Sequence, residues 1–142
     1  MTIQPVKIAI VGCGVISDAY LNTMIHQFKI LNVVGCCDLD FNKAQEKAQK
    51  YGIKALHMEE LLADSSIEIV VNLPTPMAHY PVIKQLLEAG KHVYTEKVLS
   101  VELEHAAELV KLADQKGLYL GAAPDTFLGP RSKPPALWWR AA

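Results

Sequence analysis

The chain is poor in cysteine, and its cysteines are not placed for cross-linking. Its 142 residues include three cysteines, Cys13, Cys36 and Cys37. An odd number with two adjacent members does not form a disulfide framework. Their spacing also does not bring ligands together around a zinc ion, so we expect no metal site. We interpret them as small buried thiols in a reducing compartment.

Long apolar runs and an excess of one charge are also missing. No apolar run reaches the length needed to cross a bilayer, and the N-terminus lacks the basic, apolar and small-residue order of a signal peptide. Lys and Arg number 14 against 15 Asp and Glu, which argues against a broad nucleic-acid surface. We therefore expect a cytoplasmic protein without a nucleic-acid or membrane partner. Hydrophobic residues make up 51%, enough for one domain with a core.

What the chain does have is a regular alternation of two patterns. Short apolar runs predict strands at residues 6–11, 33–37, 55–56, 67–73, 92–95 and 118–122. Amphipathic stretches predict helices at residues 15–28, 42–50, 59–63, 77–89 and 101–116. The expected apolar stripes are Val15, Ile16, Ala19, Tyr20 and Met24 on the first helix, and Leu103, Ala106, Ala107, Val110 and Ala113 on the last. Strictly alternating strands and helices with short loops predict an α/β fold with a doubly wound parallel sheet.

A glycine-rich turn, residues 12–17 (GCGVIS), joins the first predicted strand to the first helix. Gly12 would allow the tight turn, and Gly14 would let the backbone approach a pyrophosphate. Ser17 occupies the third position of the motif and is small enough for close helix–strand packing. The start of the helix then offers free N–H groups and a partial positive charge to phosphates. The alternative is a tight turn that binds nothing.

An acidic residue, Asp38, follows the second predicted strand. A carboxylate at that point accepts hydrogen bonds from the adenosine ribose and repels a 2′-phosphate, which favours NAD over NADP. The alternative is a loop or helix-capping aspartate, although Asp40 is better placed for capping. Together, the glycines and Asp38 predict a Rossmann dinucleotide-binding domain.

Two further loops follow predicted strands. Glu96 and Lys97 come after residues 92–95, where a lysine could donate to a substrate oxygen or move a proton. The alternative is an exposed ion pair. Residues 72–79 (NLPTPMAH) could wall the cofactor site through Leu73, Pro76 and His79, although His79 could equally cap its own loop.

Four segments resemble the Gfo/Idh/MocA family: GCGVIS, CCDLD, NLPTPMAHY and AGKHVYTEKVLS, within a similarity that covers residues 5–129. The resemblance implies an NAD(P)-dependent oxidoreductase that acts on sugars, polyols and related hydroxy compounds. It implies that Lys97 is the catalytic lysine. The cofactor-binding residues that we expect are Gly12, Gly14, Val15, Ile16, Asp38, Leu73, Pro76, His79 and Glu96.

The chain departs from the family pattern in three ways. Val98 stands where the family has Pro, and Pro74 where a Thr is common. The family's second domain, which supplies the substrate pocket with an Asp and a His, has no counterpart. We therefore expect residues 1–129 to be a truncated NAD(P)-binding domain, inactive alone, and to engage a hydroxylated substrate only if a second domain is present.

Residues 130–142 form a tail that resembles neither the family nor the preceding pattern, as a frameshift or a premature end of the reading frame would produce. Because the tail carries Trp138 and Trp139, we expect it to pack on its own domain or to mediate a homo-oligomer; a disordered end is the alternative. Two functional alternatives also remain: a non-catalytic NAD(H)-binding module or sensor, and NAD-assisted glycoside hydrolysis or lyase chemistry.

Overall fold

A computed structural model of the chain describes residues 4–123. The expected boundary at residue 129 and the tail with Trp138 and Trp139 lie outside the described residues. None of the helices between residues 4 and 123 has the length and apolar character needed to cross a membrane.

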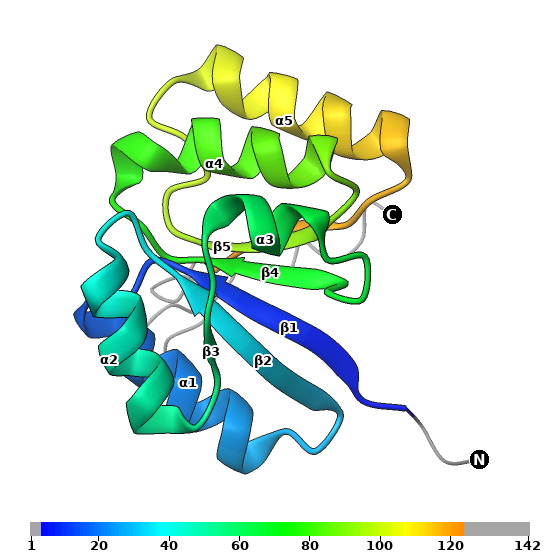
Figure 1. The fold of residues 1–142 in the computed structure, drawn as a ribbon. Coiled ribbons are helices and arrows are strands. Elements are labelled where there is room, and N and C mark those ends of the chain that lie inside the picture. The colour runs from blue at the N-terminus through cyan, green and yellow to red at the C-terminus, as the bar shows by residue number, and fades with distance from the viewer. Residues whose placement is uncertain (1–3, 124–142) are drawn as a thin grey trace, which may run out of the picture.

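The core of the structure is one parallel six-stranded sheet with the strand order β3-β2-β1-β4-β5-β6 (Figure 1). The strands are β1 (Val6–Val11), β2 (Leu31–Cys37), β3 (Lys54–Ala55), β4 (Ile69–Asn72), β5 (His92–Glu96) and β6 (Leu120–Ala123). The helices are α1 (Val15–Gln27), α2 (Phe41–Tyr51), α3 (Met58–Ala63), α4 (Pro76–Glu88) and α5 (Leu103–Lys116). The prediction of a doubly wound parallel α/β fold is confirmed.

Helices pack on both faces of the sheet, with α1 and α2 on one side and α4 and α5 on the other (Figure 1). One buried cluster joins Ile8 and Ile10 of β1 to Leu21 of α1, and includes residues of α2. The other joins Val70 of β4 to Ile83 of α4, and includes residues of α3 and α5. Central strands of a parallel sheet are apolar on both faces, and β1 (VKIAIV) and β4 (IVVN) are accordingly rich in β-branched residues.

The apolar faces expected for two helices are partly wrong. Helix α1 buries Ser17, Leu21 and Met24, whereas Val15 is 93% exposed, so the inner face of the first turn is the side that carries Ser17. Helix α5 buries Leu109 and Ala113, whereas Leu103, Ala107 and Val110 of the expected stripe are exposed. Apolar residues lie on more than one side of α5, so periodicity alone does not identify the inner face.

The strand order reverses between β1 and β4, and this reversal creates the place for a site. From β1 the chain proceeds to β2 and β3 on one side, and the later strands β4, β5 and β6 extend on the other. At such a switch point the loops after neighbouring strands diverge and leave a crevice at the carboxyl ends of the strands. The loops that begin at Gly12, Asp38, Leu73 and Lys97 all lie at this edge.

Candidate dinucleotide-binding site

Gly12 is required by the packing of the chain itself. Its φ is +96°, a conformation that residues with a side chain rarely adopt. A Cβ atom at this position would lie 2.6 Å from the carbonyl carbon of Leu73. The Gly12 N–H donates to the carbonyl oxygen of Cys37 at 2.8 Å. The turn is therefore pressed between the ends of β2 and β4, where only glycine fits.

The packing of the described chain does not require a glycine at residue 14. Its φ is −70°, which any residue can adopt, and a Cβ atom built there has no heavy atom of the described chain within 4 Å. Gly14 is also the N-cap of α1, and no side chain caps this helix. The start of α1 is thus an open end with backbone N–H groups and a positive dipole, which is the environment that a phosphate group needs.

Asp38 is joined directly to the glycine turn. Its Oδ2 accepts a hydrogen bond from the N–H of Cys13 at 2.7 Å, and its Oδ1 accepts one from the N–H of Asp40 at 2.9 Å. Two oxygens offer about four acceptor positions, so the held carboxylate can still accept from two hydroxyl groups. Asp40 caps α2 by accepting from the N–H of Asn42. The two aspartates thus divide the roles, and only Asp38 faces the turn.

Glu96 and Lys97 form a small polar cluster with a residue of α1. The Nζ of Lys97 lies 3.8 Å from Oε2 of Glu96, and the Lys97 N–H donates to the same oxygen at 3.1 Å. The hydroxyl of Tyr20 donates to the other oxygen, Oε1, at 3.1 Å. The Lys97–Val98 peptide bond is cis. Glu96 is thereby held from two sides, and it holds a half-exposed lysine at the carboxyl end of β5.

His79 is buried between the two loops that follow β4 and β5. Its Nδ1 lies 2.5 Å from the carbonyl oxygen of Val98, and its Nε2 lies 3.1 Å from that of Pro74. Both ring nitrogens therefore face carbonyl groups of the chain itself. This geometry supports a positioning role for His79, in which it fixes the loop with Pro74 and Pro76 relative to the loop with Lys97. Direct contact with a cofactor stays a prediction.

The remaining predicted residues divide into supporting and open positions. Leu73 is buried, and its N–H donates to the carbonyl oxygen of Val11 at 2.7 Å, which ties the end of β4 to the glycine turn. Pro76 begins α4 and is exposed. Val15 and Ile16 are exposed in the first turn of α1. A ligand seated on that turn would contact the two exposed α1 side chains.

Comparison with known proteins identifies the family. Over residues 6–123 the chain matches the Gfo/Idh/MocA family, described as "Oxidoreductase family, NAD-binding Rossmann fold". The chain belongs to the Gfo/Idh/MocA oxidoreductase family. The resemblance noted from the sequence motifs is thereby confirmed.

Two relatives in the Gfo/Idh/MocA family place the chain in context. An uncharacterized oxidoreductase of Schizosaccharomyces pombe is 35% identical over 123 residues, which are 82% of this chain and 33% of the relative. An inositol 2-dehydrogenase/D-chiro-inositol 3-dehydrogenase of Lactiplantibacillus plantarum is 29% identical, over 73% of this chain and 31% of the relative. The chain thus spans about a third of the length of these curated relatives.

A solved structure shows the same fold. GenD2 from gentamicin A biosynthesis, crystallised in complex with NAD, superposes with a TM-score of 0.85 at 23% identity. The match covers 92% of this chain and 37% of the GenD2 chain.

Two of the cysteines near the site, Cys13 and Cys37, are poor nucleophiles because the pKa of each thiol is raised. The Cys13 thiol donates to the carbonyl oxygen of Cys37 at 3.6 Å, and its hydrogen bond with Cys36 raises its pKa. Burial raises the pKa of Cys37 to about 11. A thiol that keeps its proton at neutral pH neither attacks carbonyl groups nor binds metals readily. Cys13, Cys36 and Cys37 are all buried, as expected from the sequence.

Three residues of the site were not identified from the sequence. Tyr20 was assigned only to the apolar face of its helix, yet its hydroxyl reaches Glu96. Asn72 and Thr95, at the ends of β4 and β5, are fully buried and joined by a hydrogen bond of 3.0 Å from Nδ2 to Oγ1. The available signal was Asn72, a polar residue in the otherwise apolar strand β4 (IVVN), because a buried polar group usually has a hydrogen-bond partner. Strand β5 (HVYTE) is itself polar, so Thr95 gave no such signal.

Proposed function

We propose that this domain binds NAD at the carboxyl ends of β1, β2, β4 and β5, as part of an oxidoreductase that acts on a hydroxylated small molecule. The observation that carries the proposal is Gly14. Its conformation suits any residue, and its Cβ direction points into space that no described atom fills. A glycine at that position is accounted for by a ligand that must approach the backbone closely.

Each part of the dinucleotide has a matching group in this arrangement. The first turn of α1, with Gly14, Val15 and Ile16, would hold the pyrophosphate by backbone N–H groups. Asp38 would accept from the adenosine ribose hydroxyls through the lone pairs that Cys13 and Asp40 leave free. Because a carboxylate repels a 2′-phosphate, Asp38 supports NAD rather than NADP as the cofactor.

Lys97 is the residue that we assign to the chemistry. When bound, the nicotinamide ring supplies the position that accepts or donates a hydride. Lys97 would donate a hydrogen bond to the substrate oxygen and hold or move a proton at its Nζ. Glu96, fixed by Tyr20, keeps the amine near the end of β5. His79 acts indirectly, because it fixes both neighbouring loops through their carbonyl groups.

The proposed substrate class is a sugar, polyol or related hydroxy compound. The inositol dehydrogenase relative supports this class, since it shares residues of this domain at 29% identity. About two thirds of that relative have no counterpart in these 142 residues, so the choice of substrate is proposed for the class only.

Asp38→Ala is expected to weaken NAD binding by about 1–3 kcal/mol, because a charge-assisted hydrogen bond to the ribose is lost. The variant should also lose most of its preference for NAD over NADP. Isothermal titration calorimetry with both cofactors measures the two effects.

Asp40→Ala is the matched control, since Asp40 caps α2 and does not face the glycine turn. Removing the cap should cost about 1 kcal/mol of folding free energy and leave NAD affinity unchanged. Equal NAD affinity for Asp38→Ala and the parent chain would contradict the assigned ribose contact.

We further expect the 142-residue chain to bind NAD yet to oxidise polyols very slowly or not at all. Hydride transfer depends on a substrate held in contact with the cofactor, and that positioning supplies much of the rate. The measurement is NADH absorbance with a panel of sugars and polyols at saturating NAD. Turnover at an ordinary enzyme rate, about 1 per second or faster, would show that these residues already form a complete substrate site.

A further inference from the structure

Half of one sheet face lacks a helix. Right-handed crossovers place α1 and α2 on one face as the chain runs from β1 to β3, and place α4 and α5 on the opposite face as it runs from β4 to β6. On the α1 side, no helix among residues 4–123 lies over β4, β5 and β6 (Figure 1). Parallel sheets are normally covered on both faces, so this half is an unpartnered surface.

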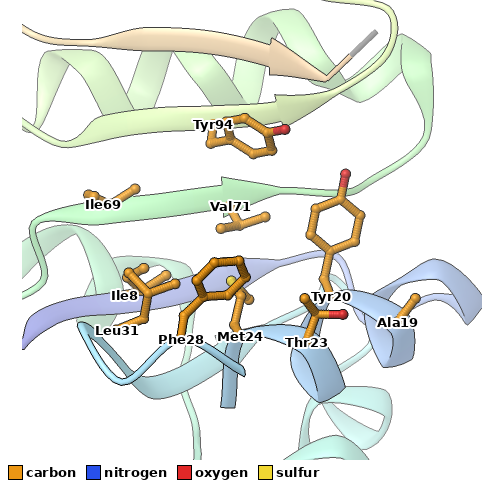
Figure 2. Close-up of a pocket in the computed structure, with 10 residues that line it drawn as sticks. All are labelled: Ile8, Ala19, Tyr20, Thr23, Met24, Phe28, Leu31, Ile69, Val71 and Tyr94. Atoms are coloured by element: carbon orange, nitrogen blue, oxygen red, sulfur yellow. The ribbon is translucent and has the colours of Figure 1, made fainter. Parts of the chain in front are cut away.

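The uncovered half forms an apolar groove of about 490 Å³ between α1 and β5. Figure 2 shows Ile8, Ile69 and Val71 along its floor, on the strands. Met24 of α1 and Tyr94 of β5 line it from opposite sides. Two of the large side chains in the groove are partly exposed to solvent: Phe28 is 47% exposed and Tyr94 is 41% exposed.

The groove lies beside the point where the described chain ends. Strand β6 is the neighbour of β5, and Gly121 pairs with Tyr94. The ring of Tyr94 packs against Gly121: a Cβ atom added to this glycine would lie 3.3 Å from Cδ2 of Tyr94. The chain continues from Ala123, the last residue of β6, into residues 124–142. This segment therefore begins one strand away from the groove.

We propose that residues 124–142 of the same chain bind in this groove and cover the open half of the sheet. The 15 residues from Ala123 to Trp138 span up to about 50 Å when extended, against a radius of gyration of roughly 13 Å for a domain of this size. The segment can therefore reach every part of the groove. The other undescribed segment, residues 1–3, spans at most about 10 Å.

The composition of the segment matches the surface. It contains Phe127, Leu128, Leu137, Trp138 and Trp139, and the groove is lined almost entirely by apolar atoms. Tryptophan side chains bury a large area each. A tethered segment also meets the groove at an effective concentration in the millimolar range, which favours the same chain over a second copy at micromolar concentration.

Tryptophan emission tests the proposal directly, since Trp138 and Trp139 are the only tryptophans of the chain. We expect blue-shifted emission, protection from acrylamide quenching, and no dependence of either on protein concentration. Thr23→Arg places a charge inside the groove and should shift the emission to that of exposed tryptophan. Asn22→Arg, on the adjacent exposed position of α1, should leave the emission unchanged.

Three results would overturn the proposal. Emission of exposed tryptophan in the parent chain would show that the segment does not bind. Blue-shifted emission that is lost on dilution, with a doubled mass by light scattering, would place the segment on a second copy. Unchanged emission in a folded Thr23→Arg chain would place it elsewhere on the domain. If circular dichroism shows that Thr23→Arg is unfolded, Phe28→Lys tests the same groove from an exposed position.

Discussion

Replacing Gly14 by valine is expected to weaken NAD binding by about 100-fold while the domain keeps its fold. The valine side chain would occupy the open space in front of the first turn of α1. Two charge-assisted hydrogen bonds from backbone N–H groups to the pyrophosphate would then lengthen or break. Their loss corresponds to about 3 kcal/mol, which is about 100-fold in affinity.

Stability should change little in the same variant. The φ of Gly14 is −70°, and no described atom lies within 4 Å of the added Cβ. The cost of a poorer N-cap is about 1 kcal/mol at most. Calorimetry with NAD and a thermal melt separate the two effects. Asn22→Val, an exposed position on the same helix, is the control that adds the same side chain away from the turn. Equal affinity for NAD in Gly14→Val and the parent would remove the main support for the site.

The strand–helix alternation was sufficient to predict the sheet and the edge that carries the site. The strands are short and mostly apolar, and parallel strands place all their carboxyl ends on one edge. The order of strands and helices in the sequence therefore predicted that Gly12, Asp38 and Lys97 lie at the same edge of the sheet. Their contacts in the structure are consistent with that placement.

The buried face of each helix was harder to predict than the position of the helix in the sequence. The residues of α5 are apolar on more than one side, so its buried face depends on which strands lie beneath it. On α1, Val15 continues the apolar period but is 93% exposed, while the polar Ser17 in the same turn is buried. Period identifies the stripe, but tertiary contacts decide how far along the helix the stripe is buried.

Most of the supporting contacts of the candidate site were not predictable from the sequence. Tyr20 meets Glu96 across 76 positions of the chain, and His79 joins the carbonyl groups of two different loops. Such contacts arise from the way that side chains extend across neighbouring loops, and no local spacing encodes them. For His79 the sequence left two roles equally open, contact with a cofactor and capping of its own loop. Its Nε2 lies 3.1 Å from the carbonyl oxygen of Pro74, which fits the capping role, and contact with a cofactor stays a prediction.

Of the two glycines in the turn, Gly14 is expected to matter for NAD binding and Gly12 for folding. Gly12→Ala should cause the largest loss of stability among the variants considered. The alanine would have to adopt a φ near +96°, which costs about 1–2 kcal/mol for a residue with a Cβ. Its Cβ would also lie 2.6 Å from the carbonyl carbon of Leu73, a backbone atom that a rotamer change does not move. Overpacking of this kind costs about 1–3 kcal/mol, so the sum is roughly 2–5 kcal/mol.

Because the free energy of unfolding of a domain is about 5–15 kcal/mol, the Gly12→Ala variant should lose a large part of its stability, measured by urea denaturation. Gly117→Ala is the matched control. Gly117 also has a positive φ, of +65°, but a Cβ there meets no described atom within 4 Å. It should cost only about 1 kcal/mol, from backbone strain alone. If both alanine variants lose stability equally, the close approach of the glycine turn to β4 contributes nothing beyond its φ. If Gly12→Ala loses more stability than Gly117→Ala, the difference between the two free energies of unfolding is the cost of the steric clash between the glycine turn and the residue after β4.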